Sequence, residues 1–365
     1  MTKMETMNSP HETYRQQSYF QSLDGVRFFS IIAVIWHHSF PEGTSAWLTK
    51  GFLGVDMFFV LSGYLIVTLL LREKEKGNIN LKNFYIRRSL RIFPVYFGLL
   101  FALLFIYGVL KQDKQEFSQL MYLMPIYLLF VSNWSVANFH NLEIYWSLAT
   151  EEQFYFLWPL IQKIFSWRVV FVILTIFIFL NQLVNFGVLD SALVKLYGTQ
   201  EVLKLSIVDS TFTPICLGVL LAHLLHKKRY FFTVFSVLKN SWSPIVILSV
   251  LLFLIFTSPA DIAGLPRFSI QILMMLWLAS LVVRENHSLQ PVMQFYPVKR
   301  IGQVSYGMYV YHMFAIHIVR VLIERLGIPF DYTLFFAASV LTFAIAEVSF
   351  RYYETPILKL KHHFS

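Results

Sequence analysis

The sequence predicts an all-α integral membrane protein, a polytopic bundle of about ten transmembrane helices with one short re-entrant or interfacial segment. The first observation behind this prediction is composition: the 365-residue chain is 56% hydrophobic and only 14% charged, with 37 Phe, 19 Tyr and 8 Trp. Its mean hydropathy is +0.58. A soluble core of this size needs no such excess of apolar residues. The second observation is that long apolar runs, separated by short polar stretches, recur along nearly the whole chain.

Eleven apolar runs are candidate helices, and charge decides how many of them cross. Basic residues cluster at 74–91, 163–168, 226–229, 299–300 and 359–361, and all clusters face the cytoplasm only if one run fails to cross. The run at 119–133 is short and interrupted by Pro125, so we expect it to be re-entrant or interfacial. The eleven runs are 24–40, 51–71, 92–110, 119–133, 150–166, 169–187, 207–226, 243–257, 268–284, 303–323 and 332–352.

The expected organisation is one membrane domain between two short polar ends. Residues 1–21 are polar and contain no cleavable signal, so the first span is expected to act as its own signal-anchor. We expect a transmembrane domain at 22–356, a basic tail at 357–365, both termini in the cytoplasm, a plasma-membrane location and no appended soluble domain. The net charge of +9 lies in short loops, which favours a topological role over nucleic-acid binding. The single Cys216 excludes an intramolecular disulfide and cannot build a metal site alone.

Two ionisable side chains share one face of the first span. Arg27 and His38 are eleven residues apart. At about 100° per residue this spacing brings them back into register, about 16 Å apart along the axis. Charged groups at membrane depth are costly and by default face a bundle interior or a wet cavity. The neighbouring His37 leaves the register of this histidine slightly ambiguous.

Two further runs place carboxylates near the outer end of the bundle. Asp56 lies in the second span, close to the pair Ser62-Gly63, and a buried carboxylate needs a partner. Helix–helix contact is the structural alternative for Ser62-Gly63. Glu151 and Glu152 begin the span after Trp146, and adjacent residues point about 100° apart, so one of them is expected to face a cavity. The structural alternative for the glutamates is a pair of charges favoured by the helix dipole.

Basic and aromatic motifs complete the set. Arg87, Arg88 and Arg91 enter the third span from the cytoplasm, and the pair one turn apart, Arg88 and Arg91, suits a phosphate ligand. A topological anchor or a lipid-headgroup contact is the alternative. His312 lies midway through the ninth span, where a hydrogen-bonded packing role is equally expected. The Arg351–Pro356 segment reads as an ion-paired helix stop.

Together these positions indicate a path from a cytoplasmic anion-binding site to a general base near the outer surface. Acyl-coenzyme A, with phosphates at one end and a thioester at the other, has the shape for such a path. No metal is expected.

The chain resembles the acyltransferase-3 family of membrane O-acyltransferases, in its standalone, glycan-modifying form, from Leu23 to Pro356. The motifs that carry the resemblance occur in the family's order. They are the pair Arg27 and His38, the run Gly54–Gly63, the pair Arg88 and Arg91, the run Trp146–Tyr155, the run Ser305–His312, and Glu354 with Pro356.

The resemblance implies transfer of an acyl group, usually acetyl, from cytoplasmic acyl-CoA to a hydroxyl of a glycan or glycoconjugate at the outer face of the plasma membrane. It implies that His38, rather than His37, is the essential histidine. Many bacterial members continue into an extracytoplasmic hydrolase-like domain, and we expect none here.

The roles that follow form one hypothesis. Arg27, Arg87, Arg88 and Arg91 bind acyl-CoA, and His38 acts as general base or is itself transiently acylated. Asp56, Glu151 or Glu152 orients the imidazole or binds sugar hydroxyls. The remaining candidates contact the acceptor: Trp146, Ser147, Gln153, Tyr306 and His312. The competing hypothesis is a transporter or flippase for an amphipathic glycan, although no related halves are visible.

Overall fold

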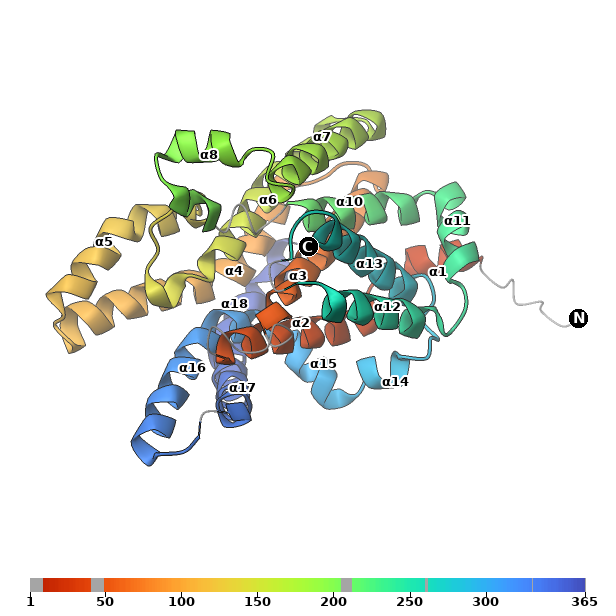
Figure 1. The fold of residues 1–365 in the computed structure, drawn as a ribbon. Coiled ribbons are helices and arrows are strands. Elements are labelled where there is room, and N and C mark those ends of the chain that lie inside the picture. The colour runs from red at the N-terminus through yellow and green to blue at the C-terminus, as the bar shows by residue number, and fades with distance from the viewer. Residues whose placement is uncertain (1–8, 41–48, 205–211, 260–261, 330, 365) are drawn as a thin grey trace, which may run out of the picture.

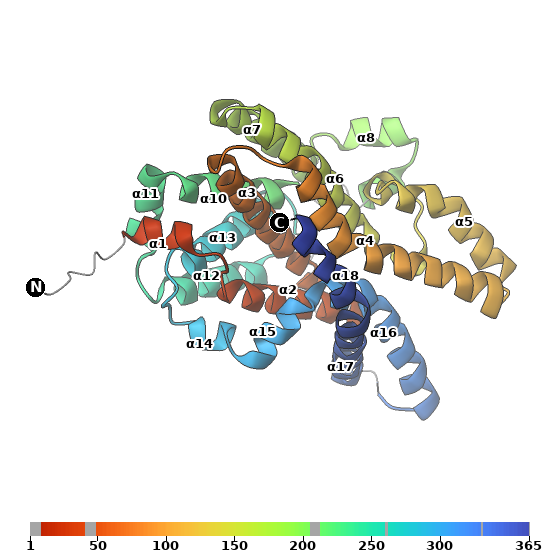
Figure 2. The ribbon, with the colours of Figure 1, turned by 180° about the vertical axis from the view of Figure 1, so that it is seen from behind.

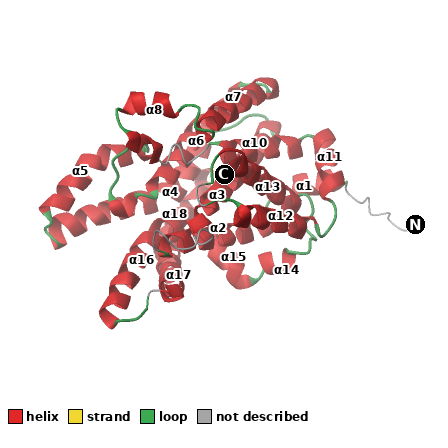
Figure 3. Cartoon of the chain, viewed as in Figure 1, coloured by secondary structure: helices red, strands yellow, loops and turns green. Residues whose placement is uncertain are grey.

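Every regular element in the described part of the chain is a helix (Figure 3). The computed structural model describes residues 9–40, 49–204, 212–259, 262–329 and 331–364. Each of the eleven predicted apolar runs falls on a helix, although the start of the run at 207–226 lies outside the described residues, as do residues 1–8. The all-α prediction is therefore confirmed.

Three helices of the first half begin where side chains satisfy free backbone amides. Ser9 and Glu12 form a capping box, and the side chains of Asn80 and Asp113 accept from amides in the first turn of their helices. The elements are α1 (Pro10–Gln16), α2 (Ser22–Ser39), η1 (Thr49–Phe52), α3 (Leu53–Glu75), α4 (Leu81–Phe105), the π-helical turn η2 (Ile106–Leu110), α5 (Lys114–Leu128), η3 (Ser132–Trp134), η4 (His140–Leu142), α6 (Tyr145–Ile164), α7 (Trp167–Asn185), α8 (Asp190–Tyr197) and η5 (Gln200–Lys204).

The second half continues as helical hairpins and short connecting helices. Gly327 ends α16 with a φ of +64°, a left-handed conformation that glycine adopts without strain. The elements are α10 (Thr213–His226), α11 (Lys228–Leu238), α12 (Ser243–Thr257), α13 (Gly264–Val282), α14 (Gln290–Met293), α15 (Tyr296–Gln303), α16 (Ser305–Leu326), α17 (Asp331–Ser349), the π-helical turn η6 (Phe350–Glu354), α18 (Thr355–Lys359) and η7 (Leu360–Phe364).

Helix α3 lies at the centre of the bundle and packs against α2, α6, α10 and α13 (Figure 1). Glycines bring α3 and α10 into backbone contact. A Cβ at Gly63 would meet the carbonyl of Ile215, and a Cβ at Gly218 would meet the carbonyl of Val60. Close approach through small residues is a standard way for helices to associate in membranes. Seen from both sides, the α4–α5 and α16–α17 pairs and α7 project outward from this centre (Figures 1 and 2).

Six helices of the described residues are long and apolar enough to cross a membrane, and a seventh span results if α11 and α12, bent by 76°, count as one. The predicted count of about ten crossings is not confirmed. Helices α2 and α6 form where spans were expected, but they fall outside these six because ionisable residues interrupt their apolar surfaces. Helix α10 is apolar but has only 14 residues. The six are Thr49–Glu75, Leu81–Leu110, Trp167–Asn185, Gly264–Val282, Ser305–Leu326 and Tyr332–Phe364.

Enlarging Gly218 is expected to destabilise the centre of the bundle. Gly218→Val would push α10 away from α3, at a cost of about 1–3 kcal/mol for an overpacked site. Thermal unfolding of the purified protein in detergent measures this loss. Ala102→Val, which adds the same kind of bulk on the exposed side of α4, serves as the control and should unfold like the wild type. Equal melting of the two variants would contradict the close packing.

The loop between α13 and α14 buries His287, which predicts an acid-sensitive contact. Its Nε2 lies 3.0 Å from Ser22 Oγ at the start of α2. Burial lowers the pKa of His287 to about 4. Because the unfolded chain takes up this proton near pH 6.5 and the folded protein does so only near 4, folding stability should fall as the pH drops through this window. The complete loss is at most about 3 kcal/mol, because partial contact with solvent screens the effect.

The comparison of wild type with His287→Gln tests this contact, since glutamine does not titrate. Melting temperatures measured from pH 7 to pH 4 should fall less steeply for the variant. Parallel curves for the two proteins would show that His287 contributes nothing to the acid sensitivity.

Candidate functional site

The two adjacent histidines at the end of α2 have different surroundings. His38 Nδ1 lies 3.0 Å from the carbonyl oxygen of Val34 and 3.4 Å from Nε2 of His312 on α16. The ring of His37 instead lies against Phe52, with ring centroids 5.8 Å apart. The side chains of His37 and His38 are both partly exposed. His38 is therefore the member of the pair whose ring nitrogen reaches α16, whereas His37 makes a hydrogen bond with the backbone at Thr49 of η1.

His312 is buried and tied to its own helix. Its Nδ1 lies 2.6 Å from the carbonyl oxygen of Tyr309. The hydroxyl of Tyr309 lies 2.5 Å from Ser147 Oγ of α6. Three helices, α2, α6 and α16, thus meet through His38, His312, Tyr309 and Ser147. The structure brings together two predicted acceptor residues and the predicted base.

Asp56 finds its partners on α13. Gln271 donates to one carboxylate oxygen at 3.0 Å, and Arg267 lies 3.4 Å from the other. Both charged side chains are almost fully buried, at 1% and 5% exposed. Pairing offsets the cost of removing these charges from water. The described contacts of Asp56 therefore join α3 to α13, and none of them involves His38.

A chain of polar contacts crosses from α6 to α3. The hydroxyl of Tyr155 donates to Ser62 Oγ at 2.9 Å, and Ser62 in turn donates to Glu151. The guanidinium of Arg88 on α4 lies 4.2 Å from the centre of the Tyr155 ring, a cation–π distance. Glu151 is thus the glutamate that faces α3, and Ser62, expected as an interhelical contact or a functional group, joins it.

Glu152 and Gln153 point elsewhere. One carboxylate oxygen of Glu152 is buried and has no hydrogen-bond partner among the described residues. Such an orphaned acceptor is unusual in a folded interior. Gln153 donates to the Phe130 carbonyl and the Asn133 side chain, both at 2.7 Å, and so anchors the turn after α5.

Two of the predicted acceptor residues hold helices together. The Tyr306 hydroxyl donates to the Ile92 carbonyl at 2.9 Å, which joins α16 to α4. The Trp146 ring packs edge-on against Phe59, with centroids 6.1 Å apart. Both side chains are partly exposed.

The predicted arginines form a group with unequal partners. Arg27 lies 2.6 Å from the buried carboxylate of Asp24, one turn earlier on α2. Arg87 donates to the Phe364 carbonyl at 2.7 Å and thereby binds the end of the described chain. Arg91 is exposed and lies within electrostatic range of Arg27 and Arg88. Arg88 and Arg91 are consequently the least committed to structural pairs.

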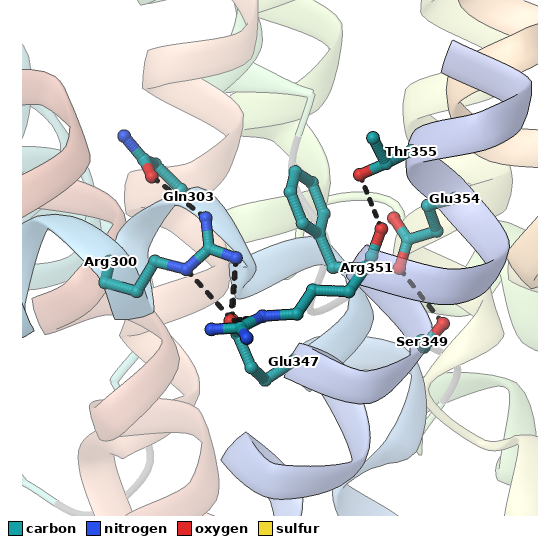
Figure 4. A network of polar contacts seen from close by, with 8 residues as sticks. Arg300, Gln303, Glu347, Ser349, Arg351, Glu354 and Thr355 are labelled. Carbon is teal, nitrogen blue, oxygen red and sulfur yellow. Dashed lines mark hydrogen bonds and ion pairs between the residues drawn. The ribbon is translucent and has the colours of Figure 1, made fainter. Parts of the chain in front are cut away.

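A polar network extends from this group toward α17 (Figure 4). Arg300 makes two 2.9 Å hydrogen bonds to Glu347, and Arg351 reaches the same carboxylate at 2.5 Å. Gln303 lies 3.3 Å from Arg300 and 3.5 Å from Asp24, the partner of Arg27. The network therefore connects α2, α15 and α17. Arg351 is ion-paired, but with Glu347 and not within its own segment. The expected helix stop is wrong, because the helical backbone continues through the π-helical turn η6 into α18 and η7.

The π-helical turn η6 directs Glu354 inward. Glu354 is buried and accepts from Ser349 at 3.1 Å, as Figure 4 shows. It also lies within electrostatic range of Arg91. π-helical turns inside α-helices occur frequently at functional sites.

Sequence reasoning missed three residues of the site. Asp24, Arg267 and Gln271 each hold a predicted residue, and Asp24 was visible as a charge beside Arg27. Arg267 is a lone cation at the edge of an apolar run, which is itself a signal of a buried partner.

Within the described ranges, no group of three or more His, Cys, Asp or Glu side chains is placed to hold a metal ion.

Comparison with known proteins shows to which family the chain belongs. The acyltransferase domain of the acyltransferase-3 family matches residues 20–348. The chain is 30% identical over 375 residues to the peptidoglycan O-acetyltransferase OatA of Listeria monocytogenes serovar 1/2a, covering 95% of this chain and 57% of that protein. It is 31% identical to a putative O-acetyltransferase of Staphylococcus aureus strain COL, with coverage of 95% and 58%.

A third relative, the O-acetyltransferase OatA of Staphylococcus aureus strain NCTC 8325, is 29% identical over 98% of this chain and 59% of its own length. The chain thus spans less than two thirds of the length of these relatives. No solved structure matches. Because the family match covers most of the residues, including every predicted site position, the chain belongs to the acyltransferase-3 family.

Proposed function

We propose that this protein transfers an acyl group, most simply acetyl, from cytoplasmic acyl-CoA to a hydroxyl of a glycan or glycoconjugate at the outer face of the plasma membrane. The family supports acyl transfer, and the names of the relatives support an acetyl group and a glycan acceptor. Both termini lie in the cytoplasm in this proposal.

The observation that carries the proposal is that one helix, α2, holds groups suited to both ends of a long donor. Arg27 and His38 are eleven residues apart on the same helix, a rise of about 16 Å. Partly or fully exposed cationic side chains lie near Arg27, and the imidazole of His38 is partly exposed at the other end of the helix. The pantetheine arm of a coenzyme A thioester extends over a distance of this order.

At the donor end, Arg88 and Arg91 bind the phosphates of the coenzyme. Guanidinium groups suit phosphate because their donors form a planar fork. Arg27 and Arg87 add positive charge to this site. Each of them is also bound to a protein group, Asp24 and the Phe364 carbonyl respectively. Glu151 and Glu152 of α6 lie within electrostatic range of Arg88.

At the acceptor end, His38 removes the proton of the attacking hydroxyl. The new carbon–oxygen bond forms at the thioester carbonyl, the carbon–sulfur bond breaks, and the proton held by His38 passes to the departing thiolate. The products are the acylated acceptor and free coenzyme A. A route through a transiently acylated histidine has the same balance. Ser147, which hydrogen-bonds to Tyr309 beside His312, contributes to the acceptor site in this proposal, together with Trp146 and Tyr306. Asp56 holds α3 against α13 through Arg267.

Replacing the base tests the proposal directly. His38→Gln should lower acyl transfer about 10²- to 10⁴-fold, the usual contribution of a general base. Release of free coenzyme A by the purified protein, with acetyl-CoA and a glycan acceptor, measures the rate. His37→Gln is the matched control and should retain activity. Full activity in His38→Gln would end the proposal, and loss in His37→Gln alone would move the role to the neighbouring ring.

Replacing the arginines separates donor binding from acceptor binding. Arg88→Gln and Arg91→Gln should each raise the dissociation constant for coenzyme A about 10- to 100-fold, since each removes a charged hydrogen bond worth about 1.5–3 kcal/mol. Calorimetric titration measures the affinity. Arg229→Gln, on the exposed surface of α11, is the control.

The Michaelis constant for the acceptor should not change in either arginine variant. An effect on the acceptor alone would contradict the assignment of this group to the donor. Thioester turnover also excludes the competing hypothesis of a flippase, because a transporter consumes no acyl donor.

A further inference from the structure

In the contact between His38 and His312, the surrounding atoms determine which ring nitrogen donates the hydrogen bond and which accepts it. Four ring nitrogens are involved, and three of them have recorded neighbours: His312 Nδ1, His312 Nε2 and His38 Nδ1. Among the described residues, His38 Nε2 has no hydrogen-bond partner. The identity of each neighbour decides which nitrogen carries a proton.

The protonated nitrogen of His312 follows from its own helix. Nδ1 lies 2.6 Å from the carbonyl oxygen of Tyr309, and the carbonyl of Met308 also lies within hydrogen-bonding reach. Carbonyl oxygens only accept, so Nδ1 must be the donor. In the neutral ring, Nε2 of His312 then carries a lone pair and acts as an acceptor.

The same reasoning passes to His38. Its Nδ1 faces two acceptors, the Val34 carbonyl at 3.0 Å and Nε2 of His312 at 3.4 Å. Two acceptors require a donor between them, so the proton of the neutral His38 ring lies on Nδ1. The lone pair is left on Nε2, the nitrogen that lacks a protein partner among the described residues.

We propose that His312 is a positioning residue that holds His38 in the tautomer with a free Nε2, and does not itself contact the acceptor. This inference rests on the proposed role of His38 as base. When Nε2 takes the proton of the acceptor hydroxyl, the Nδ1–H of the resulting imidazolium donates to His312 Nε2. No further proton moves, and the His38 proton later leaves with the thiolate. The arrangement gives His312 the orienting task that a third group performs in nucleophile–base–orienter sites.

The neighbouring histidine does not fill this role. His37 contacts the Phe52 ring and the edge of His38, and one of its nitrogens, Nδ1, is buried without a partner among the described residues. The Tyr309 hydroxyl, bonded to Ser147, further fixes the segment of α16 that carries His312. The contact between α2 and α16 thus has support from α6.

Variants of His312 test whether an acceptor at this position is what matters. His312→Gln keeps an oxygen that accepts from Nδ1–H of His38, whereas His312→Leu fills the space without an acceptor. We expect kcat to fall about 10- to 100-fold in His312→Leu, the effect of one lost hydrogen bond to a charged group. We expect KM for acyl-CoA to stay unchanged, and His312→Gln to recover most of the rate.

His317→Leu is the matched control, because His317 lies on the same helix but is exposed. It should keep the wild-type rate. Equal loss in His312→Gln and His312→Leu, or a rise in the KM for the acceptor with kcat unchanged, would overturn the inference in favour of packing or direct acceptor contact.

Nitrogen NMR of the wild-type protein labelled with 15N-histidine gives a readout that needs no activity. The chain has 11 histidines, and subtraction of the His38→Gln spectrum identifies the resonances of His38. We expect a protonated Nδ1 and an unprotonated, pyridine-type Nε2 in the neutral protein. The opposite tautomer would overturn the inference even if His38 proves essential. The expected tautomer with an active His38→Gln variant would instead refute the proposed function.

Discussion

The cost of holding ionisable groups inside an apolar bundle organises this protein. A charge removed from water needs a partner, and a partner on another helix fixes how the two helices meet. Asp56 is held by Arg267 and Gln271, so α3 and α13 have one favourable register. Arg27 is held by Asp24, which Gln303 joins to α15. The charges that suggest a function are therefore also the contacts that locate the helices around it.

Glycine packing makes these contacts possible. Because Gly63 and Gly218 allow backbone approach between α3 and α10, α3 is enclosed on several sides and its polar residues face other helices. Ser62 precedes one of these glycines and meets Glu151 of α6. A wider separation of the central helices would leave these groups in lipid, where no polar partner compensates them.

The helices could be predicted well from the sequence because an apolar run is a property of consecutive residues and needs no knowledge of tertiary contacts. The apolar runs coincide with the long helices. The predicted number of crossings is not confirmed, because α2 and α6 carry ionisable residues and are not among the six apolar helices long enough to span a membrane. Sequence reasoning also singled out Arg27, His38 and Glu151 from local pattern, and their roles stay predictions. The pairing of Asp56 with Arg267 lies beyond such reasoning, because the two positions are over two hundred residues apart and only the packing of α3 against α13 brings them together.

Adjacent positions in the sequence illustrate the same limit at finer scale. Glu151 and Glu152 are equivalent by composition, yet α6 turns the first toward Ser62 and leaves one oxygen of the second buried without a described partner. His37 and His38 differ in the same way: one packs on an aromatic ring, and the other meets a buried imidazole whose own proton is fixed by its helix. In both pairs a rotation of about 100° about a helix axis gives neighbouring residues different surroundings. The member to which we assign chemistry is the one that the neighbouring helix supplies with a directed polar contact, so in the proposed mechanism the interfaces between helices determine which residue is reactive.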